Sequence, residues 1–279
     1  MALTKEIWVA DIKENPIPDN SFINASTDMS IHVDNNKLHL AEAGVEPAVY
    51  EDYFTGNETE LPTQAITDIP SEVVLKTYST AQTRHRKLQE VELQYDKRGS
   101  IINRHKISLA KNIGKRAAHS WAPTQANSFN KVVILANGAS VIEAIIDMQA
   151  FYAGLDKAEG LHICLTPAHM ASIRKENKNL YKDILNGEKL YGFTVHQYSQ
   201  NPYYSSTGVK NPFGTAPIGT DKQASFTWAE DEVFRCFGDV EVFPTLGHSG
   251  LQADIISFAQ RALVGSIRAS NPKYGGAIL

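Results

Sequence analysis

The residues best suited to nucleophilic chemistry lie in the segment Gly247-His248-Ser249-Gly250. A serine on a tight turn between glycines is typical of the nucleophile elbow of hydrolases, whose pattern is G-x-S-x-G. Leu251 stands where that pattern requires its second glycine. A serine hydrolase that uses Ser249 is therefore the weakest candidate function of this chain.

Other chemical motifs are missing from the chain. Neither G-x-G-x-x-G nor G-x-x-x-x-G-K-[ST] occurs, so the usual cradles for dinucleotides and triphosphates are absent. The nine histidines form neither H-x-x-x-H nor H-E-x-x-H, and His162 and His169 fall on different predicted elements. The sequence therefore predicts no catalytic residue, no cofactor and no metal.

The two cysteines and two of the histidines are predicted to be poorly suited to catalysis. Cys164 lies in an apolar run and Cys236 lies between Arg235 and Phe237, which predicts two reduced and buried thiols. His85 and His105 each have two basic neighbours along the chain, which favour the neutral imidazole.

Charge is distributed very unevenly along the chain. Residues 1–72 hold fourteen acidic and three basic residues, whereas residues 73–131 hold twelve basic and three acidic ones. The remaining residues are nearly balanced, and the whole chain has a net charge of −4. An acidic leading segment followed by a basic one suits subunits in which the arm of one copy lies across the flank of the next. The pattern therefore predicts self-assembly.

Length and composition exclude several classes of protein. A chain of 279 residues with 42% hydrophobic residues can bury a substantial core as one or two domains. No window approaches 18 consecutive apolar residues, and residues 1–20 lack the pattern of a signal peptide, so we expect neither a membrane span nor export. The net charge gives no support for a dedicated nucleic-acid binder, so any contact with a polyanion must come from the local basic segment.

Residues 1–65 have the pattern of an extended arm. Prolines and Asp/Asn-rich turns interrupt them, and only residues 4–12 and 45–54 are candidates for local order. Their aromatic residues are too numerous for a solvated tail, so we expect the arm to bind another surface. The aromatic anchors are Trp8, Phe22, Tyr50, Tyr53 and Phe54.

Residues 73–95 have the pattern of a long hairpin. Residues 73–79 are rich in β-formers, and residues 91–95 alternate between apolar and polar side chains. A two-stranded hairpin is marginal alone and must lie on another surface. The expected tip carries Arg84, His85, Arg86 and Lys87, which form either an interface or a solvated charge run.

A long amphipathic helix is predicted over residues 100–119, with a length of about 30 Å at 1.5 Å per residue. Ile102, Leu109, Ile113 and Ala117 share one face. Arg104, Lys111 and Lys115 lie on the opposite face, and Trp121-Ala122-Pro123 ends the helix. The basic face is an ordinary solvated surface, a dock for a neighbour's acidic arm, or a contact with nucleic acid, and spacing alone leaves all three open.

The second half of the chain has the pattern of a compact α/β unit. Strands are predicted at residues 132–136, 161–165, 191–198, 225–228, 240–243 and 255–268. Ser140 is a candidate N-cap for a helix through residue 152, and Thr166-Pro167 begins another helix. The Gly/Pro/Ser-rich residues 201–221 indicate an exposed loop.

This order of elements resembles the major capsid proteins of tailed bacteriophages over nearly the whole chain. The segments that carry the resemblance are Tyr95-Asp96-Lys97, Lys115-Arg116-Ala117-Ala118-His119-Ser120-Trp121-Ala122-Pro123, Gly238-Asp239-Val240 and Ala262-Leu263-Val264-Gly265-Ser266-Ile267-Arg268. The end of the long helix is most similar to capsid proteins of phages that infect Bacteroidetes. The resemblance implies an α+β fold with an N-terminal arm (1–65), an extended hairpin loop (66–95), a peripheral domain with a spine helix (96–130 and 231–279) and an α/β axial domain (131–230).

The resemblance also implies a function. Hexamers and pentamers of the chain would form an icosahedral shell around double-stranded DNA in the virion, assembled in the host cytoplasm, with portal, minor capsid or decoration proteins as further partners and no membrane. An encapsulin-like nanocompartment, whose shell encloses cargo enzymes, is the alternative shell. The candidate assembly interface consists of Trp8, Tyr50, Tyr53, Phe54, Arg84, Arg86, Lys87, Arg104, Lys111 and Lys115.

Overall fold

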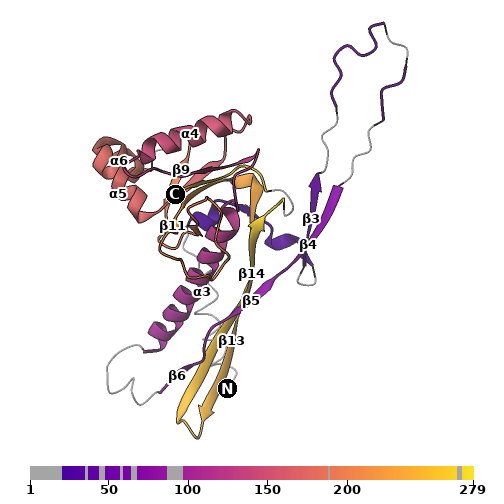
Figure 1. The fold of residues 1–279 in the computed structure, drawn as a ribbon. Coiled ribbons are helices and arrows are strands. Elements are labelled where there is room, and N and C mark those ends of the chain that lie inside the picture. Colours follow the sequence, from indigo (N-terminus) through magenta and orange to yellow (C-terminus); the bar gives the residue numbers. More distant parts are fainter. Residues whose placement is uncertain are drawn as a thin grey trace.

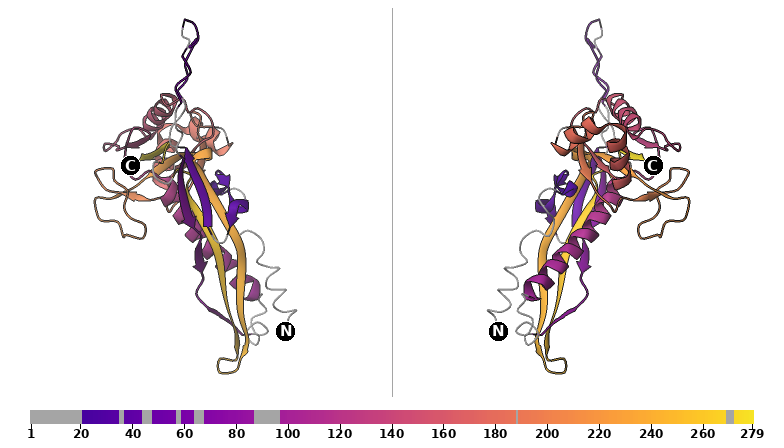
Figure 2. Two further views of the ribbon diagram at one scale, coloured as in Figure 1. Left: turned by 90° about the vertical axis from the view of Figure 1, so that its right-hand side faces the viewer. Right: turned by 90° about the vertical axis from the view of Figure 1, so that its left-hand side faces the viewer.

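A computed structural model describes residues 21–34, 37–43, 48–56, 59–63, 68–86, 97–187, 189–268 and 272–279. The molecule is elongated, with an α/β lobe at one end, a long sheet beside a long helix, and a narrow hairpin that projects from the body (Figures 1 and 2). Several expectations lie outside the described residues, namely those for Trp8, Lys87, residues 4–12 and the strand at 91–95.

The lobe is built on a five-stranded mixed sheet with the order β7-β15-β12-β8-β9. Its strands are β7 (Asn130–Val133), β8 (Leu161–Leu165), β9 (Thr194–Gln197), β12 (Ser225–Ala229) and β15 (Gly275–Ile278). Strand β15 lies parallel to β7 and antiparallel to β12, and β8 lies parallel to β9. The chain therefore closes its lobe with its last strand.

Three helices pack on one face of this sheet, namely α4 (Val141–Ala153), α5 (Pro167–Glu176) and α6 (Lys178–Leu185). The expected caps are confirmed, because Ser140 Oγ accepts from Glu143 N and Thr166 Oγ1 accepts from His169 N. Pro167 occupies the start of α5, where its missing N–H costs no helical hydrogen bond.

The long helix α3 (Lys97–Trp121) connects the lobe to the long sheet. Its C-terminal half packs on the second face of the lobe sheet through Ile113 and Ala117, against Phe226 and Trp228. Its N-terminal half packs on the long sheet, where Ile102 and Leu109 meet Val242, Ile256 and Phe258. The predicted apolar stripe is confirmed, and α3 is longer by a few residues at each end than the 100–119 expected.

The long sheet has the order β1-β13-β14-β5, with β6 also paired to β14. Its strands are β1 (Thr27–Asp28), β5 (Lys76–Ser79), β6 (Thr83–His85), β13 (Val233–His248) and β14 (Ala253–Ser266). Strand β13 far exceeds the expected 240–243, because the register shifts between Phe237 and Val240 and interrupts the alternation of side chains.

The projecting hairpin is formed by other strands than the sequence predicted, because β4 (Asp68–Val74) pairs with β3 (Lys37–Ala43). Strand β5 pairs with β14, and residues 91–95, the expected partner of residues 73–79, lie outside the described residues. A short strand, β2 (Val33–Asp34), extends the hairpin at its base. Residues 37–43, which the sequence placed in the arm, are therefore part of the hairpin.

Short elements complete the described chain. Three 3₁₀ turns are formed by η1 (Phe22–Asn24), η2 (Ser30–His32) and η3 (Glu230–Glu232). Strands β10 (Tyr203–Tyr204) and β11 (Lys222–Gln223) pair at the base of the predicted loop 201–221, which is otherwise irregular. We call residues 201–221 the strap.

The close packing of β15 gives a prediction about stability. A Cβ at Gly276 would overlap Thr227 Oγ1 and would lie 2.6 Å from Met148 Sδ. We therefore expect Gly276→Ala to lower the free energy of unfolding by about 2–3 kcal/mol, as overpacking of a close-packed core does. Urea denaturation measures the loss. Gly219→Ala is the matched control, because no atom lies within 4 Å of its added Cβ, and an equal loss in both variants would contradict the assignment.

Candidate assembly surfaces

The solvent face of α3 carries the first candidate surface. Arg104, Lys111 and Lys115 are all exposed, as their spacing predicts. Ile107 lies between them on the same side of the helix and is 44% exposed. The surface is therefore a row of positive charges around one apolar side chain, and we call these four residues the basic stripe. Because the opposite face of α3 is buried, the basic stripe faces away from the core.

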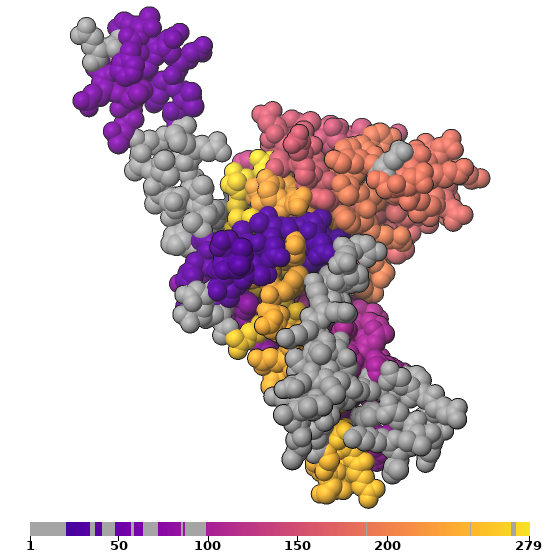
Figure 3. All heavy atoms as spheres, turned by 180° about the vertical axis from the view of Figure 1, so that it is seen from behind, coloured from indigo at the N-terminus to yellow at the C-terminus, as the bar shows by residue number. Residues whose placement is uncertain are grey.

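The loop at the end of the hairpin carries the second candidate surface. Val49 is 94% exposed and Phe54 65% exposed, and Tyr50 and Leu61 are about half exposed. We call residues 48–63 the hairpin tip. The tip stands clear of the rest of the molecule in the space-filling view (Figure 3). Large apolar side chains in such a position indicate a surface that binds another molecule.

Aromatic contacts give the hairpin tip local structure. The Tyr53 ring makes edge-to-face contacts with Tyr50 and Phe54, at centroid distances of 5.4 and 5.3 Å. The Tyr53 hydroxyl donates to the Glu60 carbonyl at 3.1 Å, which joins the two sides of the loop. The three aromatic residues predicted as anchors of the arm therefore lie together at the tip.

The hairpin also has an extreme charge. Residues 38–75 contain eight acidic residues and no lysine or arginine. At the base, Lys37 Nζ donates to Glu72 Oε2 at 2.9 Å and lowers the pKa of that carboxyl. Glu51 and Asp52 are exposed at the tip. The tip therefore combines exposed apolar side chains with negative charge, and complements the basic stripe in both respects.

The described part of the expected basic hairpin tip, residues 84–86, does not form the end of a free hairpin. Arg84 is exposed on β6, where it pairs with Ile255 of β14 in the long sheet. Arg86 follows that strand and is half-buried, with its Nε lacking a hydrogen-bond partner. Because β14 supplies the partner strand, Arg84 belongs to a sheet edge and not to the end of a free hairpin.

The first described residues are fastened to the core. Phe22 packs edge-to-face on Trp121 and Trp228, at centroid distances of 5.8 and 6.1 Å. Trp228 Nε1 donates to the Ala25 carbonyl at 2.8 Å, and the Arg235 guanidinium donates to the carbonyls of Asn24 and Ser26. Residues 21–28 are thus an anchor that fastens this end of the described chain to the core.

The strap holds the C-terminal end of α3. Lys210 Nζ donates to the carbonyls of His119 and Ala122, at 2.7 and 2.5 Å, where the helix dipole favours a positive charge. Burial lowers the pKa of the Lys210 ammonium to about 8. On the same side, the Arg116 guanidinium lies over the Phe213 ring at 3.7 Å from its centroid. The strap therefore couples the lobe to the long helix.

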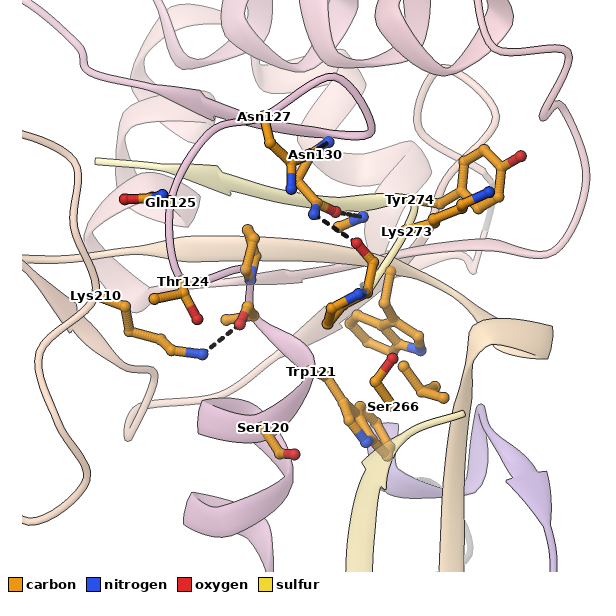
Figure 4. A pocket seen from close by; sticks show the side chains of 16 residues that line it. Ser120, Trp121, Thr124, Gln125, Asn127, Asn130, Lys210, Ser266, Lys273 and Tyr274 are labelled. Carbon is orange, nitrogen blue, oxygen red and sulfur yellow. Dashed lines mark hydrogen bonds between the residues drawn. The ribbon is translucent and has the colours of Figure 1, made fainter. Parts of the chain in front are cut away.

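A cavity of about 330 Å³ lies where α3 ends, with Lys210, Trp121 and Asn130 among the residues around it (Figure 4). Asn130 Nδ2 donates to the Pro272 carbonyl at 2.7 Å, and its Oδ1 accepts from Gly275 N at 2.8 Å. These bonds join β7 to the segment that enters β15. We therefore assign the wall of the cavity a structural role.

The residues considered for chemistry are two cysteines, His105 and Ser249. Cys164 and Cys236 are free thiols and buried, as predicted. Burial lowers the pKa of His105, so the expected neutral imidazole is confirmed with desolvation as the cause. Ser249 lies in the turn between β13 and β14, so the helix that follows the serine in a nucleophile elbow is replaced by a strand.

The described part of the chain has neither a candidate metal site nor a candidate membrane span. No group of three or more His, Cys, Asp or Glu side chains there could hold a metal ion. None of the helices in those residues is long and apolar enough to cross a membrane.

The anchored segment 21–28, a projecting hairpin, a long helix along a long sheet and an α/β lobe form an α+β fold that is similar to the fold of phage capsid proteins. Solved capsid structures have this arrangement. Mycobacterium phage Che8 aligns with a TM-score of 0.63 at 13% identity over 92% of this chain and 90% of that one. The capsid of Ralstonia phage GP4 aligns with a TM-score of 0.64 at 10% identity over 95% and 89%.

A particle from an archaeon has the same fold. The virus-like particle from Pyrococcus furiosus aligns with a TM-score of 0.62 at 10% identity over 99% of both chains. No family model and no curated protein matches the sequence. At these identities the likeness establishes the fold, and function must be argued from the surfaces.

Proposed function

We propose that the chain is a major capsid protein, which assembles with copies of itself as hexamers and pentamers into an icosahedral shell around double-stranded DNA. The complementary surfaces on one chain are the observation that carries this proposal. The hairpin tip projects away from its own α3, so the tip and the basic stripe can meet only between copies. A contact between unlike surfaces of identical chains propagates from copy to copy and forms a ring where the rotation closes. Rings of six and five copies are the units of the proposed shell.

The finer parts of the proposal follow from the same role. The protein would act structurally, without catalysis, in a virion assembled in the host cytoplasm, with portal, minor capsid or decoration proteins as partners. Phages of Bacteroidetes remain our proposed source. We keep 131–230 as the axial domain and 96–130 with 231–279 as the peripheral domain. We place the start of the extended loop at residue 37, where β3 begins, and not at residue 66.

Electron microscopy and light scattering of the purified protein test this function. We expect closed particles or rings of hexamers and pentamers, because the hairpin tip and the basic stripe each need a partner. A compact monomer of 30.8 kDa at every salt concentration, with and without DNA and a scaffold, would contradict the proposal.

A nanocompartment shell is the second candidate, favoured by the alignment with the Pyrococcus furiosus particle over 99% of both chains. The contents of particles isolated from the native source separate the two candidates. Double-stranded DNA inside supports the capsid, and a co-purified enzyme without DNA supports the nanocompartment.

The arm gives a further prediction. A deletion that continued past residue 20 would remove core side chains such as Phe22 and Leu38, so we place the deletion before the anchor. We expect removal of residues 1–20 to leave the melting temperature within about 2 °C of the full chain and to abolish particle formation. Calorimetry and electron microscopy measure the two effects. Normal particles from the shortened chain would show that the arm is dispensable.

A further inference from the structure

Histidine side chains make several of the contacts that join one element to the next. His105 Nε2 lies 2.8 Å from Thr83 Oγ1 and joins α3 to β6. His119 Nε2 donates to the Asn211 carbonyl at 2.9 Å and joins α3 to the strap. Both contacts fasten a peripheral segment to the long helix.

The lobe contains three more such histidines. His162 Nδ1 lies 3.2 Å from His196 Nε2 and joins β8 to the edge strand β9. Both rings stack on Trp228, at centroid distances of 5.4 and 5.6 Å. His169 Nδ1 lies 2.7 Å from Ser225 Oγ and joins α5 to β12. We call His105, His119, His162, His169 and His196 the junction histidines.

The surroundings of the junction histidines disfavour a positive charge. Burial is the largest cause, and it lowers the pKa of all five, that of His196 to about 4 with His162 as a second cause. Positive groups on neighbouring elements act in the same direction: Lys210 and Arg116 at His119, Lys222 at His169, and Lys189 at His162. Arg104 and Lys106 precede and follow His105 along α3.

Glu230 favours protonation of His162, but burial outweighs it and the pKa of His162 is still lowered. Glu230 Oε2 lies 3.6 Å from His162 Nε2, and the Glu230 side chain is itself half exposed to solvent. The Asn211 carbonyl favours protonation of His119, but burial and the two nearby cations outweigh it. Each junction therefore loses stability when its imidazole gains a proton.

We propose that the junction histidines act together as an acid-operated release, which loosens β6, the strap, β9 and α5 from the core when they are protonated. Because the folded state favours the neutral imidazole, the stability that these contacts add is fully present above 6.5, the pKa of an unperturbed histidine. It is lost as the pH falls below 6.5, down to about 4 at His196. The inference concerns the subunit itself and does not depend on the proposed shell.

Hydrogen–deuterium exchange at pH 7.5 and pH 5.0, corrected for the intrinsic effect of pH, tests the release. We expect exchange at residues 83–86, 167–176, 194–197 and 203–223 to rise at pH 5.0. The rise should be about tenfold or more at residues 194–197, because the pKa of His196 lies more than one unit below 6.5 and one unit is a factor of ten. Exchange in α4 and β15, which contain no junction histidine and no partner of one, should change by less than about twofold. A uniform rise across all elements, or no rise at the junctions, would overturn the proposal.

Substitutions assign the effect to particular side chains. Glutamine keeps a donor near the place of Nε2 but does not titrate, so His119→Gln should remove most of the acid response of the strap alone. His248→Gln is the matched control, because His248 is exposed at the β13–β14 turn. An acid response of the strap that persists in His119→Gln would contradict the assignment.

A second measurement covers the case in which His119→Gln already loosens the strap at pH 7.5. The Cε1 proton resonances of the unmodified protein report the protonation of each histidine directly. We expect the five junction histidines to titrate below pH 6.5, and midpoints at or above 6.5 would overturn the proposal.

Discussion

Reversal of Arg104, Lys111 and Lys115 to glutamate should abolish particle formation while the subunit stays folded. All three side chains are exposed on α3, so the monomer loses no core contact. At the proposed contact, however, glutamates would face Glu51 and Asp52 of a neighbouring hairpin tip, and like charges in an interface cost several kcal/mol. Circular dichroism measures folding, and light scattering measures assembly with and without DNA at low and moderate salt.

The alternatives left open by the sequence predict different outcomes. If the basic stripe faces the genome, the triple variant assembles but holds less DNA, because each lost phosphate contact removes counterion release. Normal shells with normal DNA content would leave the stripe as a solvated helix face and refute both interpretations. A variant with Lys175, Lys178 and Lys182 changed to glutamate is the control, since it makes the same change in charge on α5 and α6. Failure of both variants would indicate general repulsion and not a lost contact.

A charge-swap experiment identifies the partner of the basic stripe. Glu51, Asp52 and Glu60 are changed to lysine in a second variant, which should also fail to assemble alone. Mixing the two variants should restore co-assembly, because each supplies the surface that the other lacks. Failure to restore assembly would mean that the hairpin tip and the stripe do not bind each other.

Much of the fold could be predicted because it follows local rules. The apolar and basic faces of α3 both obey the helical period, so Ile113 is buried and Lys111 exposed as expected. The caps at Ser140 and Thr166 depend on neighbouring residues only, and both helices begin where predicted. Local patterns of this kind need no information about distant parts of the chain.

The pairing of the hairpin could not be predicted in the same way. Strand β3 pairs with β4 across the 24 residues between Ala43 and Asp68, and no turn motif specifies that closure. The clear alternation of residues 91–95 favoured them as the partner instead. The long sheet uses β14 beside β5, a contact between residues some 180 positions apart in the sequence.

The candidate surfaces were predicted only in part. Tyr50, Tyr53, Phe54 and the charged residues of α3 could be selected from the sequence because aromatic anchors and spaced cations are conspicuous. Val49, Leu61 and Ile107 were missed, since a lone aliphatic residue in a polar segment carries no periodic signal. The absence of lysine and arginine from residues 38–75 was the signal that could have identified the hairpin as one acidic unit.

Replacement of Val49 and Phe54 by serine should raise the concentration needed for assembly without destabilising the subunit. These side chains are 94% and 65% exposed, and the only described ring contact that is lost is that of Phe54 with Tyr53, so the free energy of unfolding should change by no more than about 1 kcal/mol. In a shell each would be buried against a neighbour, which contributes about 1.5–3 kcal/mol for a large apolar side chain. A combined loss of about 3 kcal/mol corresponds to a rise of about a hundredfold in the critical concentration. Light scattering over a dilution series measures that rise.

Leu185→Ser is the control, because Leu185 on α6 is as exposed as Phe54, at 66%. An unchanged critical concentration in the double variant, or the same rise in the control, would show that the hairpin tip is not a specific contact.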